Sequence, residues 1–496
     1  MIIGDDTEPA DWSDGEVNDP TVAPCVGTGV RTGEQLTEDQ RARLMALVSD
    51  YPDVFSDRLG YTDIAEHRIV VSDETPCYQA SYRVPESLSD QVQQELAEME
   101  RSGVRKYDPL ATWNSPMIIV RKSNGGIRIV NNFIQLNKRT IAEPYIMTNS
   151  MELLNRVAGS KYITKLDCRQ AYFQIGLEEQ SRKYTSFQTP FGTYSYLKMP
   201  IGLVGASSTL QRIMDIMLRN AHRFSDKLLD DVIVWTNDFD DHLKRLDNVL
   251  ARFRRAGLTL NVSKCHLATD RIQIFGFQVD KGLIMPDDEK TRAVSEFPTP
   301  KTKKQLASFV GLVGYFRGHI ANFAEIAFPL TELLARHQPD RLRWTDVHQG
   351  AFDKLKKALI SKPVLCPPDM SKDFELWTDS SKTTLSAVLM QRGEEGDDTP
   401  RVVSYASRKL LPREMNYSTV DRETLSVVFG VTKFRHFVFG KKIHVKNDHR
   451  ALTYLNSMVK ASSRLAKWAL ILQGYDLEIQ YVPGSQQLAD AFTRLE

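Results

Sequence analysis

The chain has 496 residues, 42% hydrophobic and 26% charged, which is too long for one core and typical of a globular protein of about two to four domains. Its 64 Lys and Arg against 63 Asp and Glu leave a net charge of +1, which excludes a globally basic chain, so any nucleic-acid partner must be recognised by local charge. Five scattered cysteines predict neither a disulfide framework nor a zinc site, and no apolar run could cross a bilayer, so we expect an intracellular protein, cytoplasmic, particle-associated or nuclear, without a membrane partner.

Residues 1–35 are acidic, rich in Gly and Pro and without apolar periodicity, which predicts a disordered leader. Residues 36–85 form a predicted N-terminal lead-in that begins with a helix. A second helix is predicted just before Gly103, because apolar residues three or four positions apart share one face there and Gly103 suits a helix C-terminus.

Residues 117–132, "MIIVRKSNGGIRIVNN", predict a β-hairpin, because two β-rich runs flank Ser-Asn-Gly-Gly. Lys122 and Arg128 lie on either side of this turn, where a solvated hairpin carries charges by default. Mixed strands and helices continue to about residue 285. Prolines then introduce a helical unit at 286–370, and residues 371–496 begin a new series of strands and helices.

Asp230 and Asp231 lie together in "KLLDDVIVW", a run otherwise apolar enough for a buried strand. Burying adjacent unpaired carboxylates is costly, so we expect a cation beside them; a strand end that turns into solvent is the alternative. Asp167 ends a similar strand-like run, "KYITKLD". Two-metal phosphoryl chemistry needs carboxylates that the fold brings together, and Mg²⁺ prefers oxygen ligands. The three residues therefore predict a divalent-metal site.

Several motifs follow one another along the chain: "SPMIIVRK", "QLNKRT", "KLDCRQAYFQIGL", "KYTSFQTPFGTYSYLKMPIGLVGASSTLQRIM", "LLDDVIVW" and "LTLNVSKCHL". Together they closely resemble the reverse transcriptase of gypsy-like long-terminal-repeat retrotransposons and their retroviral relatives. The resemblance extends from about residue 36 to the C-terminus. It implies an α+β multidomain chain, a right-hand polymerase with fingers and palm at 86–285 and a thumb or linker at 286–370.

The resemblance also implies roles for single residues. Asp167, Asp230 and Asp231 would hold two Mg²⁺ ions, with Mn²⁺ as a substitute. Lys122 and Arg128 would contact the triphosphate of the incoming deoxynucleoside triphosphate. Tyr172 would lie against its sugar ring and exclude a 2′-hydroxyl, although a tyrosine of the core is the alternative. Gly202 would allow the backbone to approach nucleotide and template.

Four acids in residues 371–496 follow the order strand, helix, strand, helix: Asp379, Glu423, Asp448 and Asp490. Each acid alone would be a surface charge by default. Their order resembles the ribonuclease H fold, an α/β domain with a mixed sheet. That resemblance implies four carboxylates that bind two Mg²⁺ ions and cleave the RNA of an RNA/DNA hybrid. His449 and Arg450 directly follow Asp448, and we expect of them a supporting role only.

Several residues depart from the family pattern. Asn132 and Ile134 stand where the family usually has Asp and Arg, and Leu228 stands where an aromatic residue, usually Tyr, precedes the Asp doublet. Further changes lie nearby, at Ile201, Gly205 and Ser207. Every metal-binding carboxylate is retained, so we hypothesise a competent but weakened polymerase.

The predicted function is an RNA- and DNA-templated DNA polymerase with coupled ribonuclease H activity, acting in retroelement replication. Its expected partners are an RNA template, a DNA primer, an RNA/DNA hybrid and deoxynucleoside triphosphates. Basic residues at 244–271 and 301–304 suit contacts with the phosphates of a hybrid, although exposed helices carry similar charges. One alternative is a catalytically silent retroelement relic that only binds nucleic acid. A cellular hybrid nuclease with an unrelated N-terminal half is disfavoured by the ordered motifs. We expect the chain to be part of a larger polyprotein or a truncated copy.

Overall fold

The computed structural model describes residues 23–24, 29–122, 125–361, 363–393, 399–449 and 463–483. The chain forms two compact units, of which the first comprises Met1–Leu153 and Ser160–Asp270, and the second Leu154–Gly159 and Arg271–Glu496. The division at Asp270 falls inside the range predicted for fingers and palm. The four boundaries between the five predicted domains stay predictions. Within the described ranges, no helix is long and apolar enough to span a membrane.

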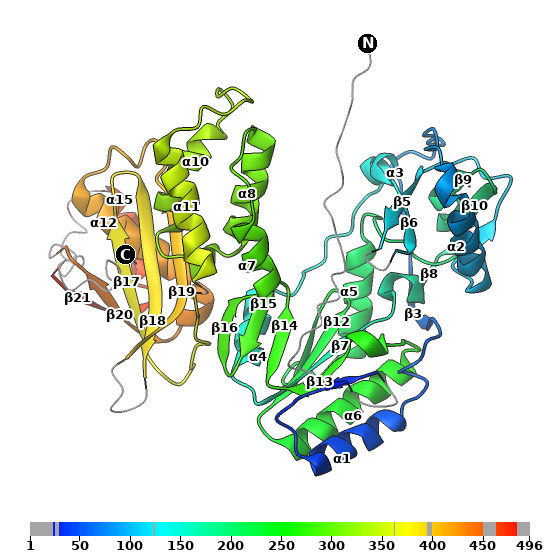
Figure 1. The fold of residues 1–496 in the computed structure, drawn as a ribbon. Helices are drawn as coiled ribbons and strands as arrows, with labels where there is room; N and C mark the ends of the chain where they lie inside the picture. The colour runs from blue at the N-terminus through cyan, green and yellow to red at the C-terminus, as the bar shows by residue number, and fades with distance from the viewer. Residues whose placement is uncertain are drawn as a thin grey trace. The chain divides into compact units, whose positions relative to one another are not determined.

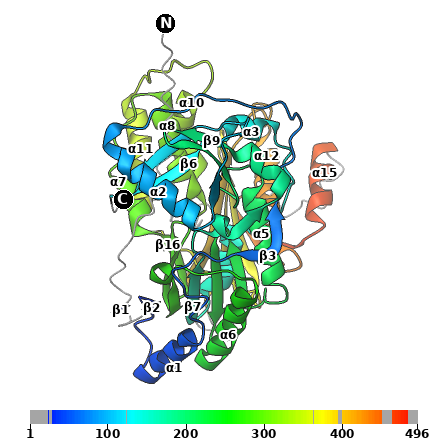
Figure 2. The ribbon, with the colours of Figure 1, turned by 90° about the vertical axis from the view of Figure 1, so that its right-hand side faces the viewer.

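A six-stranded sheet with the order β1-β2-β13-β7-β12-β11 forms the base of the first unit (Figure 1). Strands β7, β12 and β11 run antiparallel to their neighbours, and every residue of β12 is buried. Helix α6 packs on β7 and β12, and α1 packs on α6 (Figures 1 and 2). The bounds are β1 (Ala23–Pro24), β2 (Arg31–Thr32), β7 (Tyr162–Asp167), β11 (Ser225–Leu228), β12 (Asp231–Thr236), β13 (His266–Thr269), α1 (Glu38–Ser49) and α6 (Phe239–Arg255).

The leader predicted at residues 1–35 needs a correction at its C-terminal end. Arg31 and Thr32 form a strand that runs parallel to β13, and the neighbouring Val30 is fully buried. The backbone N–H groups of Arg31 and Gly33 donate to carbonyls beside and within β13, at 3.3 and 3.0 Å. Backbone groups alone can add an extended segment to a sheet, so the lack of apolar periodicity did not reveal this strand.

The predicted hairpin is present as β5 (Met117–Arg121) and β6 (Ile127–Asn131), and the predicted helix before Gly103 is α2 (Ser89–Arg101), which packs on β6. Gly103 has φ +66°, as expected for the glycine after a helix. The remaining elements of this unit are β3 (Thr62–His67), β4 (Arg105–Tyr107), α3 (Ile134–Arg139), η2 (Ala171–Gln174), β8 (Ile175–Leu177), β9 (Phe187–Thr189), β10 (Gly192–Tyr196), α5 (Ala206–Met217) and the short 3-10 helices η1 (Glu86–Leu88), η3 (Glu179–Thr185) and η4 (Val262–Lys264).

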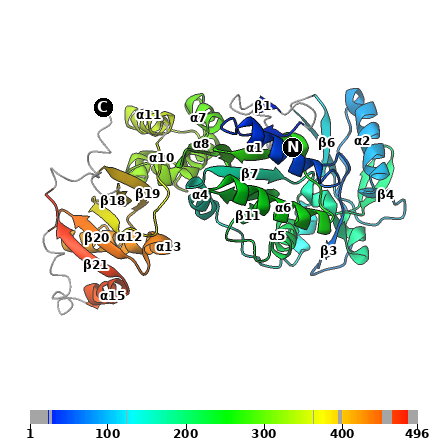
Figure 3. The same cartoon turned by 90° about the horizontal axis from the view of Figure 1, so that it is seen from below.

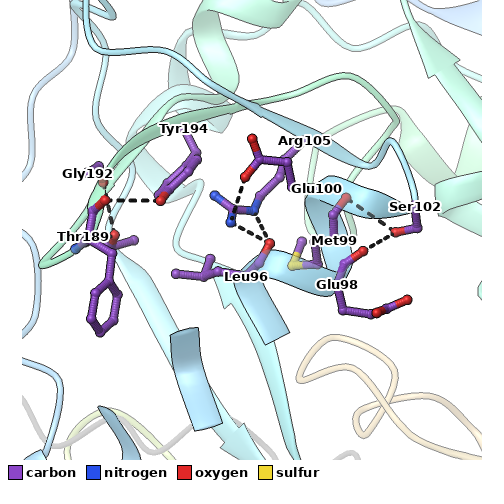
Figure 4. Close-up of polar contacts among 10 residues, drawn as sticks. Leu96, Glu98, Met99, Glu100, Ser102, Arg105, Thr189, Gly192 and Tyr194 are labelled. Atoms are coloured by element: carbon purple, nitrogen blue, oxygen red, sulfur yellow. Dashed lines mark hydrogen bonds and ion pairs between the residues drawn. The ribbon is translucent and has the colours of Figure 1, made fainter. Parts of the chain in front are cut away.

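A buried arginine ties α2 to the β4-β10-β9 sheet. Arg105 Nε donates to the carbonyl of Leu96 at 2.8 Å, and the guanidinium lies over the ring of Tyr194, 3.5 Å from its centroid (Figure 4). Glu100 lies 3.6 Å from the same guanidinium. Burial lowers the pKa of Arg105, and the ring, the carbonyl and the carboxylate together compensate for the lost hydration of its charge.

The N-terminal part of the second unit combines a small antiparallel sheet with helices. The helices lie in the segment predicted to be helical, whereas the sheet lies in the range predicted for fingers and palm. The elements are β14 (Arg271–Ile274), β15 (Phe277–Asp280), β16 (Leu283–Pro286), α7 (Asp288–Ser295), α8 (Lys303–Tyr315), η5 (Arg317–His319), α9 (Phe323–Ile326), α10 (Phe328–Leu333) and α11 (Asp346–Ile360). Helix α4 (Ser150–Ala158) crosses the boundary between the units in sequence.

The C-terminal part of the second unit is built on a five-stranded sheet with the order β19-β18-β17-β20-β21 (Figure 3). Strands β17 to β19 pair antiparallel, whereas β20 pairs parallel with β17 and β21, so the sheet is mixed, as predicted. Helix α12 packs closely on it at Gly430, where a Cβ would lie 3.1 Å from Leu376. The bounds are β17 (Phe374–Ser380), β18 (Thr384–Arg392), β19 (Pro400–Lys409), β20 (Lys442–Asn447), β21 (Asp476–Tyr481), α12 (Thr419–Lys433), α13 (Arg435–Val438) and α15 (Ser463–Leu472).

Candidate active sites

The three acids predicted for the first site meet where β7 and β12 join. Asp167 ends β7 and lies directly opposite Asp231, the first residue of β12, so both side chains leave the same face of the sheet. Asp230 occupies the two-residue turn between β11 and β12, and its carbonyl accepts a hydrogen bond from the N–H of Cys168 at 3.1 Å. Leu229, the other turn residue, has φ +56°. We call Asp167, Asp230 and Asp231 the palm acids.

The palm acids hold one another in a costly electrostatic state. Burial, and next the charge of Asp231, raise the pKa of Asp167 from 3.8 to about 7. The same two causes raise the pKa of Asp230. The three carboxyl groups can all be ionised only if a positive charge lies beside them. Metal-binding carboxylates are in the same situation before their ion binds.

Two lysines supply the nearby cations that the buried doublet required. Lys165 Nζ lies 3.0 Å from a carboxylate oxygen of Asp231. The positive charge of Lys264 offsets part of the rise in the pKa of Asp167. Lys165 stands two residues before Asp167 on the same strand, so both point to one face. Lys264 was predicted only as one of the basic residues at 244–271, and Lys165 was not predicted. The two-residue spacing of Lys165 and Asp167 in "TKLD" could have revealed Lys165.

The palm acids do not form a ready-made metal cage in this structure. In the part of the chain that the structure describes, no three His, Cys, Asp or Glu side chains form a group that could hold an ion as it stands. Asp231 is turned to Lys165, with 3.0 Å between Nζ and the carboxylate oxygen. The donor set of three carboxylates at adjoining strand ends fits a hard divalent cation.

The structure places the other predicted residues of this unit on separate elements. Tyr172 lies in η2, half-buried, and its hydroxyl is 3.1 Å from Ser207 Oγ at the start of α5. Burial raises the pKa of Tyr172, and the negative charge of Asp230 adds to the rise. Gly202 has φ +97°, and its carbonyl accepts from Asn137 Nδ2 at 2.9 Å.

Lys122 and Arg128 lie on the β5–β6 hairpin, a two-stranded sheet distinct from the one that carries the palm acids. Lys122 is exposed and Arg128 is half-buried. The altered positions nearby are also defined. Asn132 caps the backbone N–H of Ile134 at 3.1 Å, and Ile134 is 57% exposed, so neither residue braces the hairpin through a charge.

Three acids of the second group meet at the C-terminal ends of the inner strands β17 and β20 and on helix α12. Asp379 is the penultimate residue of β17, and Asp448 directly follows β20, its parallel neighbour. Glu423 projects from the first turns of α12 and is buried. Burial raises the pKa of Glu423 to about 6, and the charges of Asp379 and Asp448 add to the rise, so the three acids share one electrostatic environment. Asp490 and Arg450 lie outside the described residues.

Two uncharged residues, neither predicted from the sequence, hold Glu423. Ser380 Oγ donates to Glu423 Oε1 at 2.6 Å, and Asn447 Nδ2 donates to Oε2 at 2.9 Å. Each stands next to a predicted acid, Ser380 after Asp379 and Asn447 before Asp448. That adjacency is visible in the sequence, but the convergence on Glu423 is not.

Several of the basic residues at 244–271, which were expected to contact phosphates, bind groups of the protein itself. Arg254 pairs with Asp53 at 2.6 Å, and Arg245 pairs with Asp241 at 2.6 Å. Arg252 donates to the carbonyls of Met217 and Arg219. Arg252 and Arg254 thus join α6 to neighbouring segments, whereas the Arg245–Asp241 pair lies within α6. The expected phosphate contacts of these arginines stay a prediction.

Two family models match the chain, one over the range that holds the palm acids and one over the range that holds Asp379, Glu423 and Asp448. Residues 120–279 match the model described as reverse transcriptase (RNA-dependent DNA polymerase). Residues 369–475 match the RNase H-like domain found in reverse transcriptase. The retrovirus-related Pol polyprotein from transposon 297 of Drosophila melanogaster is 30% identical over 478 residues, covering 93% of this chain and 44% of that protein.

The chain carries the reverse transcriptase and ribonuclease H-like domains of retroelement Pol polyproteins.

Further Drosophila relatives agree with this assignment. The Pol polyproteins from transposons 412 and gypsy are 32% and 31% identical, over 92% and 85% of this chain and 37% and 42% of their own lengths. The chain thus spans less than half the length of the curated relatives it matches. Predicted family and fold class are confirmed, with the palm acids in the reverse transcriptase domain.

Solved structures show the same fold. The foamy viral protease-reverse transcriptase in complex with double-stranded DNA superimposes with a TM-score of 0.80 at 19% identity, over 91% of this chain and 95% of that one. The same viral protein in complex with an RNA/DNA hybrid gives 0.75 at 20% identity, over 91% and 61%. At this identity the likeness concerns the fold of the two domains alone.

Proposed function

We propose that the chain is an RNA- and DNA-templated DNA polymerase with a coupled ribonuclease H that cleaves the RNA of RNA/DNA hybrids during retroelement replication. The observation that carries the proposal is the pair of acid clusters, one where β7 and β12 join in the reverse transcriptase domain and one at the ends of β17 and β20 in the ribonuclease H-like domain. Each lies in the domain whose chemistry needs it, and burial opposes the charge of acids in both.

Both domain families depend in general on divalent metal ions. We propose Mg²⁺, two ions per site, with Mn²⁺ as a substitute. The palm acids would hold them in the polymerase, and Asp379, Glu423, Asp448 and Asp490 in the ribonuclease H. Such ions activate the attacking oxygen and neutralise charge on the phosphate. The chain itself supplies the ligands, and the ion pair with Lys165 holds the side chain of Asp231 in place.

The incoming nucleotide would be bound by residues of the fingers and palm. Lys122 and Arg128 on the hairpin would contact its triphosphate, since cations on a short hairpin can reach an anionic ligand. The ring of Tyr172 would lie against the sugar, its hydroxyl held by Ser207, so a 2′-hydroxyl would meet a fixed obstacle. Gly202, in a conformation that suits glycine, would let the backbone approach.

The nucleic-acid partners proposed are a template, a primer and their hybrid. Helix α8 presents an exposed stripe of Lys304, Ser308, Gly311 and Tyr315. Its small members permit close approach of a duplex backbone, and its ends offer one cation and one aromatic ring. The titles of the solved relatives name double-stranded DNA and an RNA/DNA hybrid as ligands of those proteins.

Primer extension on an RNA template and on a DNA template tests the polymerase. With Mg²⁺, the wild-type chain should extend both primers, and Asp230→Asn should reduce extension by at least about a thousandfold, because it removes a ligand from a site that works as a unit. Asp63→Asn, an exposed carboxylate on β3, is the matched control and should extend normally. No extension by the wild-type chain on either template contradicts the proposed polymerase.

Cleavage of the RNA in a labelled RNA/DNA hybrid tests the ribonuclease H separately and decides between an enzyme and a silent relic. The wild-type chain should cut and Asp448→Asn should not, while both still bind the hybrid in a mobility-shift assay. A chain that binds the hybrid but neither cuts it nor extends a primer is the silent relic.

A further inference from the structure

The carboxylate of Glu423 is clasped by hydrogen bonds on both oxygens. Ser380 Oγ lies 2.6 Å from Oε1 and Asn447 Nδ2 lies 2.9 Å from Oε2. Ser380 belongs to β17, Asn447 to β20 and Glu423 to α12, so the clasp joins all the elements that carry the described acids of this domain. Glu423 and Asn447 are 4% and 1% exposed, so water does not compete for these bonds.

The hydrogen bonds of Asn447 fix which way its amide points. Its Oδ1 accepts from the backbone N–H of His449 at 2.8 Å. Its Nδ2 therefore faces the other way, where it contacts Thr378 O and Oγ1, both at 3.1 Å, as well as Glu423. A flipped amide would place an oxygen against the carboxylate and a nitrogen against a donor, so the network has one satisfied orientation.

We propose that Ser380 and Asn447 are positioning residues for metal binding by the ribonuclease H-like domain, which fix the side chain of Glu423 between Asp379 and Asp448. The inference rests on the proposed function of this domain. Neutral donors hold the carboxylate in one rotamer without adding a competing charge, and each oxygen keeps a lone pair for an ion. Residues that orient a metal ligand from behind commonly change metal affinity by about 10- to 100-fold when removed.

The two positions also allow variants of different severity. Ser380→Ala removes the bond to Oε1, the one bond described for that side chain. Asn447→Asp keeps the shape and the acceptor for His449 but replaces the donor with an oxygen that faces Glu423. The structure therefore predicts a moderate effect for the first and a larger effect for the second, because only the second adds repulsion.

Mn²⁺ binding to the full chain, measured by electron paramagnetic resonance of the free ion, tests the inference without substrate. Asp230→Asn/Asp231→Asn serves as the background, so that binding reports the ribonuclease H acids. We expect the dissociation constant to rise about 10-fold with Ser380→Ala and about 100-fold with Asn447→Asp. Asn416→Asp, an exposed change of equal charge in the same domain, should leave it unchanged.

A double-mutant cycle with Glu423→Gln separates positioning from general stability. If the clasp acts through Glu423, then Ser380→Ala should lose its effect on Mn²⁺ affinity in the Glu423→Gln background, whereas a loss of stability would persist there. In the same chains, the Mg²⁺ concentration for half-maximal RNA cleavage should rise with Ser380→Ala, and excess Mg²⁺ should restore the rate.

The outcomes are distinct. If the background chain binds no Mn²⁺ and the wild-type chain cuts no RNA, the proposed function of the domain is wrong. If the background chain binds Mn²⁺ and Ser380→Ala binds it equally well, the positioning role is wrong while the function stands. Should Asn447→Asp fail to fold, as thermal unfolding would reveal, Ser380→Ala and the cycle still decide.

Discussion

Leu228 lies at the end of β11, directly opposite Asp231, and is 7% exposed. It fills the place of an aromatic residue beside the palm acids with apolar bulk but without a ring or a hydroxyl. A buried leucine stabilises a strand end through its apolar contacts. It cannot make the contact with the primer terminus that the tyrosine of the family would make, so we expect primer extension to be weaker.

Leu228→Tyr should therefore raise kcat/KM for primer extension by about 10-fold, because one recovered hydrogen bond contributes about 1.4 kcal/mol. Leu228→Phe is the matched control, since it adds the ring without the hydroxyl and isolates the hydroxyl contribution. RNA cleavage by the same preparations should not change. Equal extension by all three chains would contradict the hypothesis of a polymerase weakened at this position.

At Asp230 we expect a trade-off, because its charge destabilises the folded chain but is needed as a proposed metal ligand. The folded-state pKa of Asp167, about 7, is above its ordinary value of 3.8, so the folded chain binds more protons than the unfolded chain between these values. Stability contributed by this group is thus greatest below pH 3.8 and falls as pH rises to 7. At pH 8 the full repulsion is present.

In the presence of a chelator, Asp230→Asn should raise the free energy of unfolding at pH 8 by on the order of 1 kcal/mol, since it removes one buried like charge. At pH 4, where Asp167 is protonated, the gain should largely disappear. Denaturant unfolding at both pH values measures this, with Asp63→Asn as control. Added Mg²⁺ should stabilise the wild-type chain more than the variant. A destabilised Asp230→Asn at pH 8 would show that repulsion does not dominate there.

At the scale of elements, much of the fold could be predicted because its signals are local. The turn residues of the β5–β6 hairpin, the apolar face of α2 and the strand ends at Asp167 and Asp379 are each readable within a few positions. The partners of Lys165 and Asn447, Asp231 and Glu423, come from another strand and a helix, so these two contacts are not readable locally, although the spacing of Lys165 and Asp167 is. The strand at Arg31 and Thr32 was missed because backbone hydrogen bonds, which carry no sequence signal, hold it.

The segment at Gly202 has a left-handed backbone conformation and is held by Asn137 of α3. Its φ of +97° suits glycine, whereas an added Cβ would meet nothing nearer than Phe133, at 3.7 Å. Asn137 of α3 holds the segment on both sides, donating to the carbonyl of Gly202 and accepting from the N–H of Val204, both at 2.9 Å. Space is available, so the requirement for glycine is conformational.

Gly202→Ala should lower the free energy of unfolding by about 1–2 kcal/mol, through backbone strain alone. Gly311→Ala in α8, where nothing lies within 4 Å of an added Cβ and the backbone is helical, should instead raise it by up to about 1 kcal/mol. Chemical denaturation of both variants measures the contrast. Equal effects of the two substitutions would mean that the left-handed backbone at Gly202 relaxes without cost.

At the scale of the whole molecule, the helices after the small β14–β16 sheet are joined to the ribonuclease H-like sheet within the second unit. Strand β19 is an edge strand, and its outer side meets η5 and α9. Arg317 donates to the carbonyl of Ser407 at 2.5 Å, and the N–H of Ala324 donates to Ser407 Oγ at 2.9 Å. Lys409 pairs with Glu332. An edge strand covered in this way is also protected from pairing with other chains.

These contacts predict that the helices and the ribonuclease H-like domain open as one cooperative body. Ser407→Ala leaves the N–H of Ala324 without its acceptor at a position that is 4% exposed, so the free energy of unfolding should fall by about 1–3 kcal/mol. Hydrogen exchange should then speed up in β19 and in α9 together. Ser404→Ala, on the same strand but bonded only to the carbonyl of Tyr405, should change neither. Faster exchange in β19 alone would show that the helices and the sheet open independently, and that movements of the helical unit are not passed to the ribonuclease H-like domain through Ser407.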